Sequence, residues 1–303
     1  MDFLISGQHI EIYYLIGIGL IAGIFGGFFG VGGSFLVGPA LFALGMPMNM
    51  VVGTDLAHIV GKSIVATKKH RALGNVDMKL AGIMIIGTVL GSEIGAQVVQ
   101  YLKKSGRVDQ VIGTVFIVVL VCISGFMTWE GWKTLRMKGG HKTTGGKKDK
   151  SAISHVAKWV QRIPLAPMLR LPVSGVPRIS LWIVVLVSFV GGLFSGFLGG
   201  GAGYIRMPLL VYLLGIPTHV AVGTDLFEVM ISASYGTLTH AVKGNVDIMV
   251  ALVMHTGAAI GAQVGAIGTQ YFTGPKIRLA FVPLPLIGAA LVAYRLFSGH
   301  PLK

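Results

Sequence analysis

The sequence predicts an all-α polytopic membrane protein, on three observations. Hydrophobic residues make up 53% of the chain, charged residues only 12%, and the mean hydropathy is +0.77. A soluble domain carries about 25% charged residues, so this chain lacks the charged shell that a soluble protein needs. Apolar stretches of about 20 residues, enough to cross the hydrocarbon core as a helix, recur along the chain. The short alternating segments of a membrane β-barrel do not occur.

A duplicated stretch organises the chain. Residues 23–77 and residues 192–247 share the tetrapeptides GTDL and GNVD, at a nearly constant offset of 169 or 170 residues. Similar glycines and prolines stand between the two tetrapeptides in both copies. We therefore divide the chain into three parts: a first transmembrane repeat (1–132), a basic loop with an amphipathic helix (133–178) and a second transmembrane repeat (179–303).

Glycine clusters interrupt the first apolar span of each repeat, at residues 30–33 and 199–203. The apolar pieces that follow, near 34–44 and 204–214, reach only about 16 Å as helices, because each residue adds 1.5 Å. A bilayer core of roughly 30 Å is too thick for them, so we expect half-helices and about eight full spans. A continuous, kinked helix is the alternative. A break at membrane depth needs protein or a watery cavity beside it, which makes the repeated break a candidate site.

The basic loop predicts the topology. Residues 133–178 hold eleven Lys or Arg and one acid, and so supply +10 of the net charge of +14. The positive-inside rule places this loop in the cytoplasm, with the amphipathic stretch 151–163 on the membrane surface. Prolines between 164 and 177 prevent a continuous helix before the second repeat. The charge lacks a nucleic-acid-binding module, so we expect no nucleic acid partner. Parallel and inverted repeats both remain open; we favour inverted repeats, a recurrent plan of transporters.

Ionisable side chains within the spans are the candidates for ion coupling, because such groups are costly in a membrane and are usually functional. The spacing of Asp55, His58 and Lys62 puts them on one face of a helix. The corresponding face of the second repeat carries Asp225, Glu228 and Ser232. Proton or ion coupling is expected from Asp55, His58, Asp225 and Glu228. Capping of a helix by the Thr or Asp of the GTDL motif is the rival interpretation.

A small oxyanion is the predicted substrate. The helix that starts after a glycine break offers free N–H groups and the positive end of its dipole, and Arg206 lies one turn inside the second such helix. Lys62 is the other cation within a predicted span. Alternatively, Lys62 has a structural role and pairs with Asp55 or Glu93. The candidate substrate-binding residues are Gly30, Gly32, Gly33, Ser34, Gly199, Gly200, Gly201, Gly203, Arg206, Lys62, Thr54 and Thr224.

The glycine break, the GTDL motif and the GNVD motif, repeated around a basic central loop, resemble the TauE/SafE family of sulfite and organosulfonate exporters. The resemblance covers nearly the whole chain outside 133–178. It implies a bacterial inner-membrane permease that exports small sulfur-containing anions, such as sulfite or sulfoacetate, coupled to a proton or sodium gradient. A homodimer remains open.

Three other activities were weighed. A passive anion channel and a permease for another small organic anion use the same features. An enzyme needs a nucleophile or a metal cluster, and the sequence offers only Cys122 and scattered histidines. The glycine clusters are not P-loops, because no Lys-Ser/Thr follows in frame. We therefore expect no catalytic residue, no metal and no cofactor.

Overall fold

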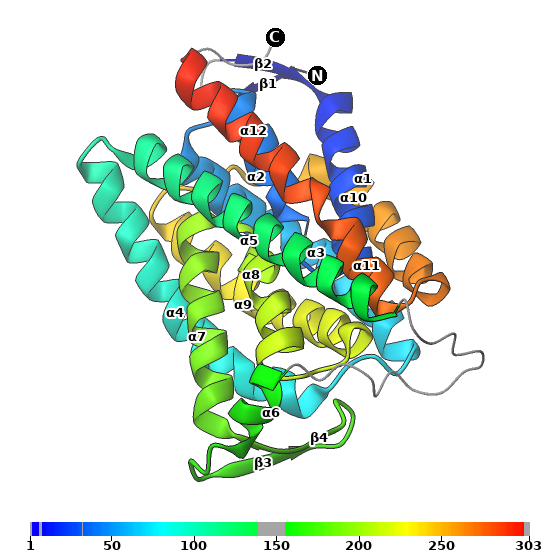
Figure 1. Cartoon of the computed structure of the whole chain (residues 1–303). Coiled ribbons are helices and arrows are strands. Elements are labelled where there is room, and N and C mark those ends of the chain that lie inside the picture. Colours follow the sequence, from blue (N-terminus) through cyan, green and yellow to red (C-terminus); the bar gives the residue numbers. More distant parts are fainter. Residues whose placement is uncertain (1, 6–7, 32, 139–154, 300–303) are drawn as a thin grey trace.

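Helices dominate the computed structural model, which describes residues 2–5, 8–31, 33–138 and 155–299 (Figure 1). The helices are α1 (Ile12–Phe29), α2 (Ser34–Ala43), α3 (Met48–Ala72), α4 (Met78–Lys104), α5 (Val108–Lys138), α6 (His155–Arg162), α7 (Leu181–Leu198), α8 (Gly203–Pro208), α9 (Thr218–Val242), α10 (Ile248–Gly268), α11 (Gly274–Phe281) and α12 (Pro283–Ser298). Short 3₁₀ or π turns cover Gly200–Ala202, Leu209–Leu213 and Thr269–Tyr271. Two antiparallel hairpins join β1 (Asp2–Ile5) to β2 (Gln8–Glu11) and β3 (Met168–Leu171) to β4 (Val176–Ser180).

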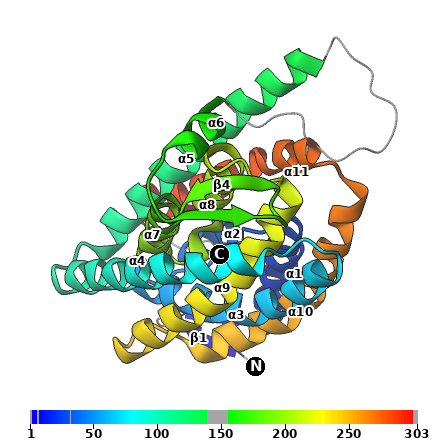
Figure 2. The ribbon, with the colours of Figure 1, turned by 90° about the horizontal axis from the view of Figure 1, so that it is seen from below.

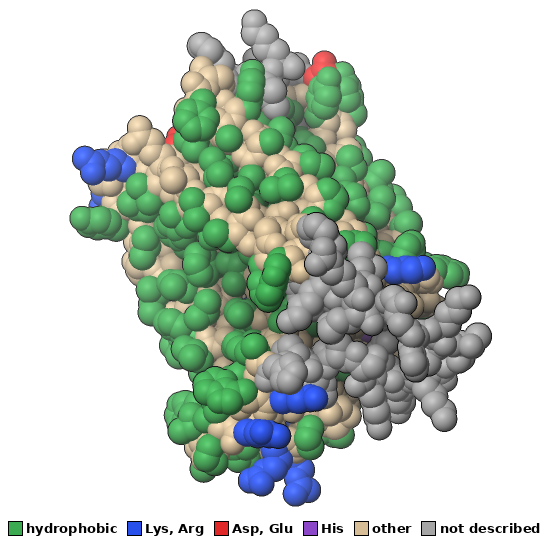
Figure 3. All heavy atoms as spheres, viewed as in Figure 1, with side chains coloured by type: hydrophobic (Ala, Val, Ile, Leu, Met, Phe, Trp, Pro, Cys, Tyr) green, Lys and Arg blue, Asp and Glu red, His purple; other side chains and the backbone are tan. Residues whose placement is uncertain are grey.

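Six stretches of the described chain are long and apolar enough to cross a membrane. They are Ile12–Phe29, Met78–Lys104, Val108–Trp129, Leu181–Leu198, Ile248–Tyr271 and Lys276–Ser298. This confirms the predicted class, an all-α polytopic membrane protein. Figure 3 agrees with it: apolar side chains cover the middle of the visible face, and Lys and Arg side chains gather mainly at its ends.

The first helices of the two repeats run in opposite directions. In Figure 1, α1 leaves the β1–β2 hairpin at the top and descends, whereas α7 leaves the β3–β4 hairpin at the bottom and rises. The chain termini lie together at the top. Each of these helices packs on a helix from the other repeat, α1 on α10 and α7 on α4.

Glycines let these two helix pairs approach within backbone contact. A Cβ added to Gly91 of α4 would lie 2.2 Å from the carbonyl oxygen of Phe189 in α7, closer than any real contact. A Cβ on Gly261 of α10 would lie 2.2 Å from the carbonyl oxygen of Leu20 in α1. Each pair uses a stripe of glycines spaced four residues apart, Gly87, Gly91 and Gly95 in α4 and Gly257, Gly261 and Gly265 in α10. These glycine stripes follow the small-residue rule for helices in lipid.

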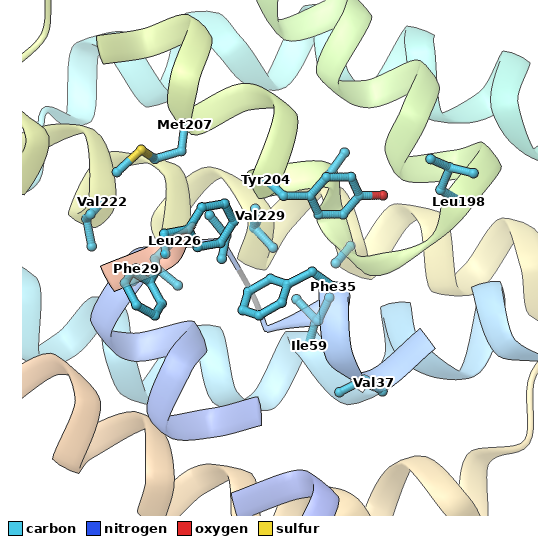
Figure 4. Packing of buried hydrophobic residues seen from close by; sticks show 14 of the residues in the cluster. Phe29, Phe35, Val37, Ile59, Leu198, Tyr204, Met207, Val222, Leu226 and Val229 are labelled. Atoms are coloured by element: carbon cyan, nitrogen blue, oxygen red, sulfur yellow. The ribbon is translucent and has the colours of Figure 1, made fainter. Parts of the chain in front are cut away.

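The helices α3 and α9 form the middle of the molecule. They pack on each other, α3 also packs on α10, and α9 also packs on α4. Figure 4 shows the apolar packing around them, where Phe35 of α2 and Tyr204 of α8 face each other near Ile59 and Val229. Both helices carry buried polar side chains along one face, and that burial positions the site described below.

The described parts of the connection between the repeats contain more regular structure than the sequence indicated. Helix α5 continues to Lys138, nine residues beyond the end of its apolar span at Trp129. The predicted helix over 151–163 is confirmed only as α6, and its first residues fall outside the described part of the chain. The proline-rich stretch forms the β3–β4 hairpin, which the sequence analysis missed because strands of four and five residues carry little periodic signal. Figure 2 shows this hairpin crossing the lower face of the helices.

Candidate functional site

Both predicted helix breaks are present. Helix α1 ends at Phe29, Gly30 has a positive φ of 76°, and α2 begins after Gly33, whose φ is 73°. Helix α7 ends at Leu198, and Gly199 to Gly201 all have positive φ angles between 70° and 84°. Glycine adopts this backbone conformation without steric cost, which explains why glycines occupy these positions. Gly32 lies outside the described residues, and for Ser34 only the backbone is described.

The helical pieces after the breaks are short. Helix α2 has 10 residues and α8 has 6, followed by a π turn of 5. At 1.5 Å per residue, α2 reaches only about 15 Å, half of a bilayer core. The alternative of one continuous kinked helix is wrong, because several residues with left-handed backbone separate α1 from α2 and α7 from α8.

The breaks meet the central helices and each other. A Cβ on Gly30 would lie 2.6 Å from Cα of Val222 in α9, and a Cβ on Gly199 would lie 3.0 Å from Cα of Val52 in α3. A Cβ on Gly203 would lie 2.5 Å from Cα of Val31 and 2.9 Å from Oδ2 of Asp225. The fold therefore brings the two glycine clusters, 170 positions apart in the sequence, to one place beside the ionisable residues.

Arg206 of α8 is completely buried and is held by carboxylates of α9. Its Nε donates to Oδ1 of Asp225, and its Nη1 pairs with Oε2 of Glu228. Its Nη2 donates to the carbonyl oxygen of Gly201 at 3.1 Å, and its Nη1 lies 3.4 Å from Oγ1 of Thr88. The two carboxylates are also completely buried. One guanidinium therefore faces two carboxylates here, and binding of an external anion by Arg206 remains a prediction.

Asp55, His58 and Lys62 share the buried face of α3, and each is only 1% exposed. The Nζ atom of Lys62 lies 3.2 Å from Nδ1 of His58, which in turn lies 3.6 Å from Oδ1 of Asp55. The carboxylate of Asp55 also interacts electrostatically with Lys62. Glu93, the other partner considered for Lys62, instead accepts hydrogen bonds from Tyr235 and other side chains.

The threonines of the two GTDL motifs make equivalent contacts between the repeats. Oγ1 of Thr54 accepts from the backbone N–H of Asp247 at 2.9 Å, and Oγ1 of Thr224 accepts from that of Asp77 at 2.9 Å. The idea that the motif caps its helix is wrong: α3 begins at Met48 and α9 at Thr218, so the motifs lie in the second turn. Asp77 and Asp247 cap the helices that follow them, α4 and α10, because their side chains accept from backbone N–H groups of the first turn.

Comparison with known proteins decides the family. The sulfite exporter TauE/SafE family matches residues 15–292. The chain belongs to the TauE/SafE family. It is 27% identical over 293 residues to the probable membrane transporter protein YunE of Bacillus subtilis, covering 94% of this chain and 98% of that protein. YjnA of the same organism, also named a probable membrane transporter protein, is 22% identical over 278 residues, which cover 90% of this chain and 96% of YjnA.

A plant protein named sulfite exporter TauE/SafE family protein 2, from Arabidopsis thaliana, is 29% identical over 105 residues, 34% of this chain and 23% of that protein. No solved structure matches this chain. The chain is therefore a TauE/SafE membrane transporter whose relatives are named as transporters, and its buried charges are the natural place to look for substrate chemistry.

Sequence reasoning missed two polar residues near the candidate site, Thr88 and His255. Thr88 of α4 bonds to Met84, to Ser188 and to Arg206, and its position beside Gly87 in a glycine stripe hid it. His255 of α10 was counted only among the scattered histidines. Its imidazole lies against Gly61 of α3, where an added Cβ would be 2.0 Å from Cε1. Position 255 corresponds to Ile85 in the first repeat, and that mismatch was the available signal.

Two further histidines, one in each repeat, have structural contacts. Nε2 of His70 lies 3.0 Å from the carbonyl oxygen of Gly27, and Nε2 of His240 lies 3.0 Å from that of Gly196. Each histidine thereby fixes the C-terminal half of a central helix to an interrupted helix. Within the described residues no group of three His, Cys, Asp or Glu side chains is arranged to hold a metal ion. The buried charged side chains of the candidate site are suited to bind ions.

Proposed function

We propose that this TauE/SafE protein is a secondary transporter that exports small sulfur-containing anions, sulfite or organosulfonates such as sulfoacetate, coupled to an ion gradient. The observation that carries the proposal is the pair of buried cations, Lys62 and Arg206, beside two helix breaks at the centre of the molecule. A buried cation within a membrane protein is costly and therefore points to a functional site. The family name supplies the class of substrate.

We further propose eight full spans and two half-helices arranged as inverted repeats. The six apolar spans would be completed by α3 and α9, which at 25 residues each extend about 37 Å. Their lower hydropathy fits helices that other helices shield from lipid. The opposite directions of α1 and α7, and the reciprocal Thr54–Asp247 and Thr224–Asp77 contacts, support the inversion (Figure 1).

The end that carries α6 and the β3–β4 hairpin is proposed to face the cytoplasm of a bacterial inner membrane. Lys158, Arg162 and Arg178 line a pocket there, and Figure 3 shows Lys and Arg side chains gathered at this end of the visible face. The positive-inside rule favours a cytoplasmic position for such a surface. The termini would then lie on the periplasmic side, and the transporter would act as a monomer or homodimer.

Alternating access is proposed to expose the central site to each side in turn. Two contacts hold the central helices to the other repeat in this structure. Thr54 of α3 binds Asp247 at the start of α10, and Thr224 of α9 binds Asp77 at the start of α4. Opening one of these contacts while the other stays closed would give access from one side only. Asp55, His58, Asp225 and Glu228 are the proposed carriers of the coupling proton or sodium ion, because all four are buried and ionisable.

Flux into proteoliposomes tests the proposal. Purified full-length protein is reconstituted, and uptake of labelled sulfite is measured with and without a proton or sodium gradient. We expect saturable uptake that a gradient accelerates, with competition by sulfoacetate. Uptake that never saturates and ignores both gradients would indicate a passive channel. Uptake of carboxylates but not of sulfite would indicate a permease for another organic anion.

A further inference from the structure

We propose that the substrate oxyanion binds at a basic cluster formed by Lys62, His58 and His255, and that Arg206 does not contact the substrate. This inference rests on the proposed anion export, and it assigns the anion to one of the two buried cations. The basic cluster lies where α3 packs against α10. Arg206 and Lys62 differ in the charged groups that surround them.

Arg206 has little capacity left for a further anion. Its Nε, Nη1 and Nη2 all have acceptors, and two of these acceptors are the carboxylates of Asp225 and Glu228. With both carboxylates ionised, the group carries a net charge of −1. An approaching sulfite or sulfonate would meet net repulsion at this group, and breaking a buried guanidinium–carboxylate pair would leave an uncompensated buried charge.

Lys62 has less acidic surroundings. One buried carboxylate, Asp55, interacts with it electrostatically, so that the two carry no net charge when both are ionised. The Nζ atom of Lys62 also lies 3.2 Å from an imidazole nitrogen, Nδ1 of His58. An ammonium group has three N–H donors and no acceptor, so donors remain for an incoming oxyanion. Nε2 of His58 is buried and has no hydrogen-bond partner. Nδ1 of His255 is also without a partner, and its ring lies against Gly61, the neighbour of Lys62.

Comparison of the repeats shows that this basic cluster is specific to one of them. The positions corresponding to Lys62, His58 and His255 hold Ser232, Glu228 and Ile85. Gly61, which makes room for the imidazole of His255, corresponds to Ile231. Four differences thus fall at one place, and three of them put a nitrogen base beside α3. Nitrogen donors gathered at one place suit an anion with several oxygen atoms, such as a sulfite or sulfonate group.

Binding measurements on the purified, detergent-solubilised full chain test this assignment. The probes are sulfite, sulfoacetate and acetate, followed by titration calorimetry. The double variant Asp55→Asn/Lys62→Gln removes the cation and keeps the local charge balance. We expect its affinity for sulfite to fall about ten- to hundredfold, the loss typical of a charge-assisted hydrogen bond. Lys62→Arg keeps the charge and should bind sulfite, and His255→Ile, which installs the residue found at position 85, should weaken binding several-fold.

The matched control neutralises the other group, as Arg206→Met/Asp225→Asn/Glu228→Gln. We expect this triple variant to lose gradient-driven uptake, because Asp225 and Glu228 are proposed coupling groups, but to keep equilibrium binding of sulfite, because Arg206 does not contact the substrate. Loss of sulfite binding in the triple variant, with normal binding in Asp55→Asn/Lys62→Gln, would overturn the assignment. If the wild type binds acetate but not sulfite, and binding still requires Lys62, the basic cluster stands and sulfite export fails. Wild-type binding of all three anions that is indifferent to Lys62 and His255 would also overturn the assignment.

Discussion

The central helices α3 and α9 have equivalent packing and opposite charge. In each helix, the GTDL threonine accepts a hydrogen bond from the backbone N–H of the GNVD aspartate in the other repeat. Near the C-terminal end of each helix, a histidine contacts the carbonyl oxygen of a glycine. Four positions after the GTDL threonine, the charged residues of the two helices differ. One helix has His58 followed by Lys62, and the other has Glu228 followed by Ser232.

The difference separates what the fold needs from what the substrate needs. Glycine–backbone and threonine–backbone contacts tolerate no larger or apolar side chain, so both repeats keep them. The side chains at positions 58, 62, 228 and 232 are buried as well, yet their charges differ between the repeats. A transporter that handles an anion and a coupling cation needs two unlike sites, and divergence of these few positions would provide them on one duplicated scaffold.

Removal of Arg206 should produce the largest difference in stability between a change beside α9 and the matching change in α3. Arg206→Met leaves Asp225 and Glu228 buried and facing each other, and loss of one partner of a buried ion pair costs about 3–5 kcal/mol. Lys62→Met should cost less, because it leaves one buried carboxylate, Asp55, without its cation rather than two. Thermal unfolding of the detergent-solubilised variants measures both losses.

Neutralising the carboxylates provides the control for this prediction. Arg206→Met/Asp225→Asn/Glu228→Gln should recover most of the stability that Arg206→Met loses, since no charge is then left unpaired. A single Arg206→Met protein as stable as the wild type would contradict the ion-pair account, and so would a larger loss from Lys62→Met than from Arg206→Met.

The glycine interfaces should respond equally in the two repeats. Gly91→Ala and Gly261→Ala both force a methyl group to within 2.2 Å of a carbonyl oxygen on a neighbouring helix. Overpacking of this kind costs about 1–3 kcal/mol, and we expect similar losses in both variants. Gly82→Ala, on an exposed position of α4 with nothing within 4 Å, should be neutral or slightly stabilising. Thermal unfolding compares the three, and unequal losses would break the equivalence of the α1–α10 and α4–α7 pairs.

The sequence predicts the helices and their breaks better than it predicts which side chains contact each other. Composition, the repeated motifs and the glycine clusters indicated membrane helices, two breaks and the shared face of Asp55, His58 and Lys62. The partners of Arg206 could not be predicted, because α8 and α9 meet only after a turn that no local pattern specifies. Motif capping by Thr54 was a local interpretation, whereas its real partner, Asp247, lies 193 residues away.

The smallest expected effect concerns the two threonine contacts. Thr54→Val and Thr224→Val each remove the acceptor for one buried backbone N–H, which should cost about 1–3 kcal/mol. Thr→Ser at the same positions keeps the hydroxyl and should restore most of the loss. The two ends differ in one respect: Oδ2 of Asp77 also accepts from the hydroxyl and the backbone N–H of Ser174 in the β3–β4 turn. We therefore expect Thr224→Val to be the milder of the two, because the hairpin still holds Asp77. Thermal unfolding that gives the reverse order would contradict a supporting role for the hairpin at that end.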